Sequence, residues 1–344
     1  MKSSICLFLA GLIVTVCAWC AAFSQTPGAQ NDAKEGLPTF VVTDVAKKIK
    51  IIAYGDARFT DPADTVHTNV IVRRSLMDKI VQEKPDALLF SGDMPYRGAN
   101  NEDWQEVDKE IKPLWDAKIR IYPALGNHEL WGDENHALRN WWKRFPDLQD
   151  RRWYSVLFGN CYFIVLDSDS KLQNGDAQDH WLSAQLAHLP VEADFIFFVL
   201  HHPPYTDSHD SLLGGGHSAR KQEKLLAARL EALQPNTRAR FVVVAGHVHN
   251  YERFEYSGVT YLVTGGAGAT PYLFDRSPDD KYQGGNSATY HFVRFEIDGT
   301  HLKGTMMRLD MASPEKAKFD ERDSFRLDAV PLKTPAITGR AAVR

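Results

Sequence analysis

The chain has 344 residues, of which 44% are hydrophobic and 24% are charged, a balance that is ordinary for a soluble globular protein. This composition excludes a disordered chain, a fibrous protein and a membrane protein with many spans. The formal net charge of -4 gives no broad positive field that would gather nucleic acid along its backbone, so any site for phosphate groups must be local.

The first residues have the features of a signal peptide. Lys2 precedes an apolar run from Ile5 to Phe23, and a polar stretch follows it. Ala22 and Ser24 are small residues at a suitable spacing, so residues 1–24 are predicted to form a leader that is cleaved after Ser24. The apolar run also approaches the length that a bilayer needs, so an uncleaved anchor is the alternative. We expect an exported protein, periplasmic or secreted, with no stable membrane association once the leader is cleaved.

The predicted mature chain has a single cysteine. Cys6, Cys17 and Cys20 lie in the leader, so Cys161 remains alone and cannot form an internal disulfide. It stands in the apolar stretch 161–166, which predicts a buried core thiol.

Five short apolar segments each end in a polar cluster. After a linker at 25–45, these segments occupy 50–54, 87–90, 119–125, 195–200 and 241–245. Helices are predicted over 68–83, 103–115, 179–188 and 219–233, the first of them from its helical period. Strands that alternate with helices predict an α/β fold with a mostly parallel sheet. In such folds, ligands bind beyond the carboxyl ends of the strands.

From residue 259 onward the pattern changes to that of antiparallel strands joined by turns. The expected strands cover 261–264, 290–297 and 301–307. We expect them to form a second sheet packed on the first, within one domain at 46–310. The charged tail at 311–344 receives no structural prediction.

The polar clusters contain the residues with candidate chemistry. They are Gly55-Asp56, Gly92-Asp93-Met94-Pro95-Tyr96, Gly126-Asn127-His128-Glu129, His201-His202 and Gly246-His247-Val248-His249. Singly, each has a structural alternative, because Asp56 and Asp93 could cap helices and the histidines could be satisfied loop residues. The last cluster is stronger evidence for a metal site, because two imidazoles separated by one residue, as in His247 and His249, can each face a different metal ion.

In this order, and each after an apolar strand, the five clusters resemble the calcineurin-like metallophosphoesterases and, within them, the purple acid phosphatases, across roughly residues 48–270. The resemblance implies a four-layer α-β-β-α sandwich with two mixed β-sheets flanked by helices. It also implies two metal ions bridged by Asp93. Asp56, Tyr96 and His249 would complete the first site, and Asn127, His202 and His247 would complete the second.

The donor types agree with two unlike metal sites. Three anionic oxygens and one imidazole suit ferric iron at the first site. Two imidazoles, an amide oxygen and the shared carboxylate suit zinc, manganese or ferrous iron at the second. Arg58 stands where many relatives carry a histidine ligand, and an arginine cannot ligate. Tyr96 stands where purple acid phosphatases supply a tyrosinate instead.

Two metal ions close together lower the pKa of a bound water and clamp phosphoryl oxygens for in-line attack. The resemblance therefore implies an enzyme like an acid phosphatase, acting on phosphate monoesters. His128 is the candidate proton donor and substrate contact, and His209 is a further candidate catalytic histidine. Arg58 either forks onto a substrate phosphate or pairs with a nearby carboxylate such as Asp61 or Asp64.

His201 is expected to point away from the metal ions, if its segment is extended, and to have a supporting role. The substrate would be a small-molecule or exposed phosphate ester, and no binding to a nucleic-acid backbone is expected. A phosphodiesterase or nucleotidase using the same site is the alternative. A non-catalytic phosphate-binding envelope protein is the third hypothesis. The sequence leaves the oligomeric state open.

Overall fold

The computed structural model describes residues 36–173, 175–209, 217–285, 289–311 and 317–331. The predicted leader at 1–24 and the linker as far as residue 35 lie outside these ranges. Within them, no helix combines the length and the apolar composition that a bilayer crossing requires.

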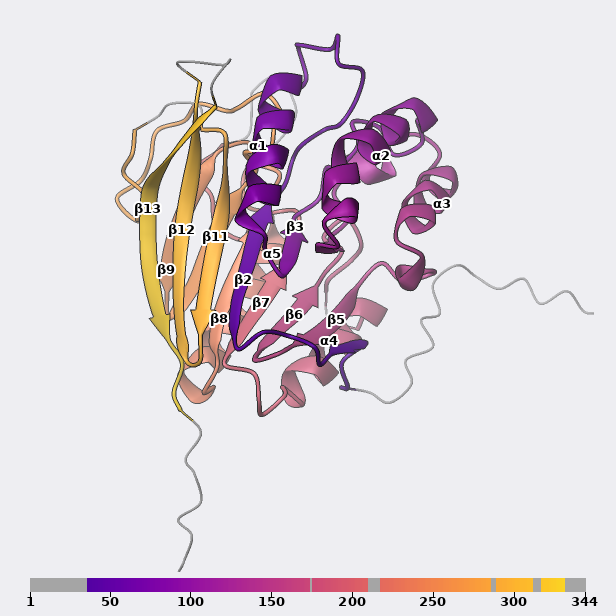
Figure 1. Cartoon of the computed structure of the whole chain (residues 1–344). Coiled ribbons are helices and arrows are strands. Elements are labelled where there is room, and N and C mark those ends of the chain that lie inside the picture. The colour runs from indigo at the N-terminus through magenta and orange to yellow at the C-terminus, as the bar shows by residue number, and fades with distance from the viewer. Residues whose placement is uncertain (1–35, 174, 210–216, 286–288, 312–316, 332–344) are drawn as a thin grey trace, which may run out of the picture. The chain divides into compact units, whose positions relative to one another are not determined.

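Two mixed sheets form the centre of the described fold (Figure 1). The six-stranded sheet has the order β13 (Lys318–Asp328), β12 (His301–Asp310), β11 (His291–Asp298), β2 (Lys48–Tyr54), β3 (Ala87–Phe90) and β4 (Arg120–Pro123). The seven-stranded sheet has the order β1 (Phe40–Val42), β5 (Tyr154–Phe158), β6 (Cys161–Val165), β7 (Phe195–Val199), β8 (Arg240–Ala245), β10 (Val259–Thr264) and β9 (Tyr251–Tyr256).

Helices flank both sheets. The four predicted helices are confirmed as α1 (Val70–Glu83), α2 (Asn101–Asp116), α4 (Ala177–Ala187) and α5 (Lys221–Leu233). The sequence did not predict α3 (Glu134–Arg144), because few of its residues are apolar. Short 3₁₀ turns cover His128–Leu130, Pro146–Leu148 and Gln234–Asn236.

The strands are apolar runs because both of their faces are buried. On β7, Phe197 faces the other sheet, where its ring lies 5.1 Å from that of Phe295. The adjacent Phe198 faces a second core cluster that contains apolar residues of α4 and α5. Residues of α1 and α2, such as Leu76 and Trp104, pack into the first cluster with the six-stranded sheet. The result is the expected four-layer sandwich. Cys161 is fully buried, as predicted.

The expected division into one parallel and one antiparallel sheet is wrong. Strands β2, β3 and β4 lie in one sheet, whereas β7 and β8 lie in the other. The later strands complete both sheets, since β10 pairs with β8 and β11 pairs with β2. An apolar strand that is buried on both faces has the same pattern in either sheet, so the sequence did not identify its partner. The six-stranded sheet also extends beyond residue 310, because β13 pairs along β12, and the predicted linker contains β1.

Candidate metal centre

The candidate residues follow the carboxyl ends of strands from both sheets. Asp56 follows β2, Asp93 follows β3 and Asn127 follows β4, while the histidines follow β7 and β8. Two groups of potential ligand atoms form there, and within each group the atoms lie within 4.8 Å of one another. One group consists of Asp56, Asp93 and His249, and the other of His201, His202 and His247. The fold therefore brings together residues from segments far apart in the sequence.

The backbone is strained where these side chains emerge. Asp56, Asp93 and His247 have φ angles of 64°, 58° and 68°, a region that residues other than glycine seldom adopt. Such strain persists only where the surrounding structure enforces it, and it concentrates at functional sites. Gly92 has a φ of 92°, and a Cβ there would lie 2.7 Å from Nδ1 of His201. Strain and close approach together restrict which residues fit at these turns.

The two aspartates do not cap helices. Asn69 caps α1 and Asn100 caps α2. Both carboxylate oxygens of Asp56 instead accept from the backbone N–H of His247, at 3.0 Å each. The structural alternative for these aspartates is therefore wrong.

His249 presents an unpaired nitrogen to the first group. Its Nδ1 lies 2.7 Å from the carbonyl oxygen of Thr270, which can only accept, so Nδ1 carries the proton. Nε2 is buried, has no hydrogen-bond partner among the described residues and lies 3.5 Å from Oδ1 of Asp56. Burial lowers the pKa of His249 well below its usual value, so the imidazole is neutral. A lone pair that faces carboxylates fits a bound cation, and fixing Nδ1 through a carbonyl is typical of metal-ligating histidines.

His201 has the same arrangement in the second group. Its Nδ1 donates to the carbonyl oxygen of Ser91 at 2.8 Å. Its Nε2 lies 3.2 Å from Oδ1 of Asp93 and 3.1 Å from Oδ1 of Asn127. Burial lowers the pKa of His201, so this Nε2 is also a lone pair that faces oxygen atoms. Nδ1 of His247 is 3.3 Å away, which adds another potential ligand. The residues present fit a second cation.

The prediction that His201 points away from this centre is wrong. The chain bends at His201 and His202, so the alternation of an extended segment does not apply. Nδ1 of His202 contacts Oγ of Ser168 at 2.8 Å, and the His202 ring stays 4.3 Å from the ring of His247. Both histidines therefore border the centre, and His201 is the one that contacts Asp93 and Asn127.

Glu129 holds two of the ligand loops together. Its side chain is buried, and Oε2 accepts from the N–H groups of Asp93 and Gly126 at 2.8 Å each. Oε1 accepts from the N–H of Met94 at 2.7 Å. Burial and the charge of Asp93 raise the pKa of Glu129 to about 8. Although burial opposes it, the charge of Arg58 and the backbone N–H of His128 hold the pKa of Asp93 below its usual value.

His128 lies beside Asp93, and its role as proton donor stays a prediction. Its backbone N–H donates to Oδ1 of Asp93 at 3.0 Å, and its Nε2 lies 3.7 Å from Oδ2 of the same residue. Nδ1 donates to the carbonyl oxygen of Tyr96 at 2.6 Å. Burial lowers the pKa of His128 to about 4, so the ring is neutral near pH 7.

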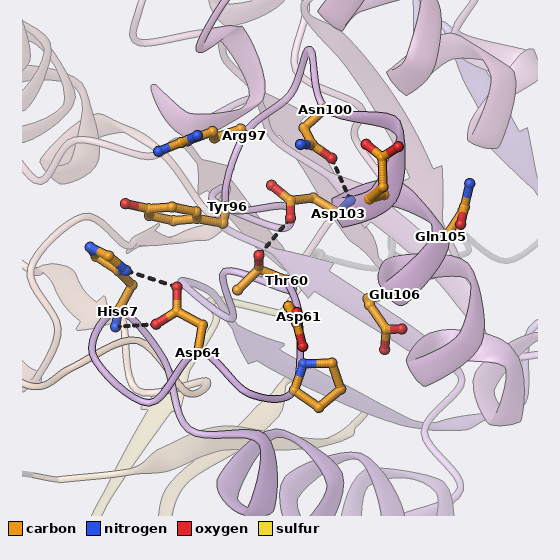
Figure 2. Close-up of a pocket in the computed structure, with 12 residues that line it drawn as sticks. Thr60, Asp61, Asp64, His67, Tyr96, Arg97, Asn100, Asp103, Gln105 and Glu106 are labelled. Carbon is orange, nitrogen blue, oxygen red and sulfur yellow. Dashed lines mark hydrogen bonds and ion pairs between the residues drawn. The ribbon is translucent and has the colours of Figure 1, made fainter.

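Tyr96 lies beside His128 and forms part of a pocket (Figure 2). Its ring stacks on His67 with centroids 4.6 Å apart and lies 5.5 Å from the ring of His128. The pocket has a volume of about 540 Å³, and carboxylates outnumber basic groups in its lining. Its charged residues are Asp61, Asp64, Arg97, Glu102, Asp103 and Glu106, with His67 as a titratable neighbour. A bond from Tyr96 to a metal ion stays a prediction.

Arg58 contacts a different carboxylate from those that the sequence suggested, and His209 remains untested. Arg58 pairs with neither Asp61 nor Asp64, because its guanidinium lies 3.3 Å from Oδ2 of Asp93. His209 is exposed and precedes residues 210–216, which lie outside the described ranges, so its catalytic role stays a prediction. From the same loop, the His217 ring lies 5.1 Å from the ring of His247.

No sequence pattern pointed to Tyr272. Its ring stacks on His249 with centroids 4.2 Å apart, and its N–H donates to the carbonyl oxygen of His249 at 3.1 Å. Burial together with the charges of Asp56 and Asp93 raises the pKa of its hydroxyl to about 12, and the charge of Arg58 opposes that rise. Tyr272 stands outside every motif and reaches the centre only through the folding of the loop after β10.

A buried carboxyl outside the centre predicts a pH effect on stability. Glu252 on β9 is fully buried, and burial raises its pKa from 4.5 to about 8. The folded state therefore binds a proton that the unfolded state releases above pH 4.5, so stability falls as the pH rises from 4.5 towards 8. Each unit of pKa difference corresponds to about 1.4 kcal/mol.

We expect wild type to lose more unfolding free energy between pH 5 and pH 8 than Glu252→Gln does, as measured by urea denaturation. The control is Glu255→Gln, which changes an exposed carboxyl on the same strand and should behave as wild type. Equal losses in wild type and Glu252→Gln would show that Glu252 is ionised in the fold.

Comparison with known proteins agrees with this geometry. Residues 49–251 match the family model described as calcineurin-like phosphoesterase. Purple acid phosphatase 21 of Arabidopsis thaliana is 25% identical over 220 residues, which cover 57% of this chain and 45% of that protein. A probable glycerophosphodiester phosphodiesterase GpdQ of Arcobacter nitrofigilis is 22% identical over 210 residues, or 58% of this chain and 71% of that protein.

The fold has matches among solved structures. Purple acid phosphatase PPD1 from yellow lupin superposes with a TM-score of 0.62 and 16% identity, over 88% of this chain and 58% of that chain. The chain spans less than half the length of the Arabidopsis relative. At these identities, the structural likeness supports the fold alone.

Proposed function

Since this chain belongs to the calcineurin-like phosphoesterase family, we propose that it is a metal-dependent phosphatase that hydrolyses phosphate monoesters. The observation that carries the proposal is the pair of buried imidazoles, His201 and His249, whose Nδ1 atoms are fixed by carbonyl groups. Their Nε2 lone pairs face the carboxylates of Asp93 and Asp56. That arrangement fits two cations better than a structural core.

Asp56, Asp93 and His249 would hold one ion, with Tyr96 as the further proposed ligand. Asp93, Asn127, His247 and His201 would hold the other, and His201 replaces His202 in that role because its Nε2 contacts both oxygen ligands. Ferric iron at the first site and zinc, manganese or ferrous iron at the second are proposed from the donor types. When bound, the ions supply positive charge to the phosphoryl oxygens and make a water acidic.

Residues of the chain itself hold the ligand loops in place and supply a proton to the leaving group. Glu129 fixes the loops that contain Asp93 and Asn127 through its backbone contacts. His128 is the proposed proton donor to the leaving alkoxide. Because its Nδ1–H is committed to Tyr96, the donor atom is Nε2, which carries a proton only in the charged ring. Its lowered pKa means that this form increases at acidic pH, as for an acid phosphatase.

A phosphodiesterase is the second candidate, because a relative bears the name glycerophosphodiester phosphodiesterase and shares the family. The third hypothesis, a non-catalytic phosphate-binding protein, has less support, because two groups of potential metal ligands lie together among the described residues. Export also remains a proposal, since it depends on the leader at 1–24.

The test is a hydrolysis screen with defined metals. We expect p-nitrophenyl phosphate to be hydrolysed about tenfold or more faster than bis(p-nitrophenyl) phosphate, in kcat/KM. Esters whose alcohol bears an amine belong in the screen, because carboxylates predominate in the pocket beside Tyr96. Faster turnover of the diester would favour the phosphodiesterase. No turnover with zinc, manganese or iron would favour the binding protein.

A further inference from the structure

The guanidinium of Arg58 places a permanent positive charge beside the carboxylate of Asp93, which the two proposed metal sites share. Its NH2 and Nε atoms lie 3.3 Å and 3.4 Å from Oδ2 of Asp93, and its side chain is only 13% exposed. An arginine stays protonated at every pH that a folded protein meets. One oxygen of the carboxylate that is proposed to bridge two metal ions is therefore already engaged by a cation.

The two oxygens of Asp93 have different partners. Oδ1 faces the second group, with Nε2 of His201 at 3.2 Å. Oδ2 faces Arg58, whose charge also acts on the two other members of the first group, Asp56 and His249. The charge of Arg58 also acts on Tyr272, whose ring stacks on His249. Arg58 therefore contacts the oxygen of Asp93 that His201 does not contact, and its charge reaches members of both groups.

From this asymmetry we infer that the guanidinium of Arg58 substitutes for a cation at the first group, so that the two metal sites load in order. The second site, at Asp93, Asn127, His201 and His247, binds its ion first. The first site, at Asp56, Asp93 and His249, fills only when Arg58 leaves Oδ2 of Asp93. This inference rests on the proposed two-metal centre and adds the residue that controls its loading.

The movement needed is confined to the side chain. The backbone of Arg58 is fixed, because its N–H donates to the carbonyl oxygen of Asp93 at 3.0 Å and its own carbonyl accepts from Arg73. Once released, the guanidinium presents two N–H groups suited to a phosphate oxygen pair. An anion that captures Arg58 must then strengthen ion binding at the first site, and the reverse must also hold.

Metal titration of the full chain tests the order of loading. We expect zinc titrated into wild type by calorimetry to bind one equivalent tightly and a second at least about tenfold more weakly, because like charges repel at the first site. Arg58→Gln should tighten the second equivalent about tenfold or more and leave the first unchanged. Arg58→Lys keeps the charge and should behave as wild type.

A matched control is Arg74→Gln. Arg74 is an exposed arginine on α1, so its loss removes the same charge at a position outside both groups of potential ligands. Its zinc isotherm should equal that of wild type. Inorganic phosphate should tighten the second equivalent in wild type by more than in Arg58→Gln, because only wild type has a guanidinium to release.

Each outcome separates the inference from the function on which it rests. Two equivalents of equal affinity in wild type, unchanged in Arg58→Gln, would overturn the role of Arg58 and leave the two-metal centre standing. If Arg58→Lys binds zinc as Arg58→Gln does, the charge is not the cause and the inference is again wrong. If wild type and every folded variant bind no zinc, manganese or iron, the proposed function itself fails. Circular dichroism establishes that each variant is folded.

Discussion

Asp93→Ala should reduce kcat/KM for a phosphate monoester by about 1,000-fold or more and should remove metal binding at both sites. The reason is that Asp93 is the carboxylate common to both groups. Oδ1 meets His201 at 3.2 Å, and a carboxylate oxygen of Asp93 also lies in the group with Asp56 and His249. The measurements are steady-state hydrolysis and the metal content of purified protein by mass spectrometry.

Asp93 also organises its surroundings, so the experiment needs a variant that preserves them. Its Oδ1 accepts from the N–H of His128 at 3.0 Å, and the alanine variant loses that contact. Asp93→Asn keeps the shape and can keep an acceptor, and it should fold while losing most metal affinity. Asp78→Ala changes an exposed aspartate on α1 and should leave both readouts unchanged. Full metal content in folded Asp93→Asn would contradict the bridging role.

His201→Asn should reduce kcat/KM by about 100-fold or more, whereas His202→Asn should cost about tenfold or less. The imidazole of His201 is fixed by the carbonyl oxygen of Ser91 and directs Nε2 at Asp93 and Asn127. In His202, by contrast, Nδ1 is hydrogen-bonded to Oγ of Ser168. His201→Asn should also lose one equivalent of metal, which a merely structural role would not affect.

The adjacent pair is its own matched control, because the two substitutions are identical and both side chains are buried. Thermal unfolding of both variants shows whether either fails to fold. The opposite ranking, with the larger loss of metal and of activity in His202→Asn, would restore His202 as the ligand. Equal losses would mean that both imidazoles bind the second ion.

Local patterns predicted most of the centre. Asp56, Asp93, Asn127, His247 and His249 each follow an apolar strand closely, and that short-range signal needs no knowledge of the partner strand. The carboxyl ends of parallel strands meet at one edge, so polar residues after them gather wherever the strands pair. The four helices could be predicted for the same reason, since the backbone hydrogen bonds of a helix join residues that are close together in the sequence.

The acidic pocket beside Tyr96 could not be predicted from local sequence patterns. Thr60 and Asp103 are joined by a hydrogen bond of 2.5 Å across 43 residues, and residues of both segments form the wall (Figure 2). The resemblance to purple acid phosphatases implied that Tyr96 is a ligand, which stays a prediction. It gave no reason to place His67 against that ring or to gather carboxylates around it.

By itself, then, the sequence determined the kind of fold, the strands that precede the polar clusters and the types of donor atom that those clusters contain. The tertiary structure alone decided which sheet each strand joins, which of His201 and His202 faces Asp93, and where the guanidinium of Arg58 lies. Each of these depends on contacts between distant segments. Ser91 fixes His201 across 110 residues, and Tyr272 stacks on His249 only after the loop beyond β10 folds back. A pattern read along the chain does not contain those contacts, because packing between segments sets them.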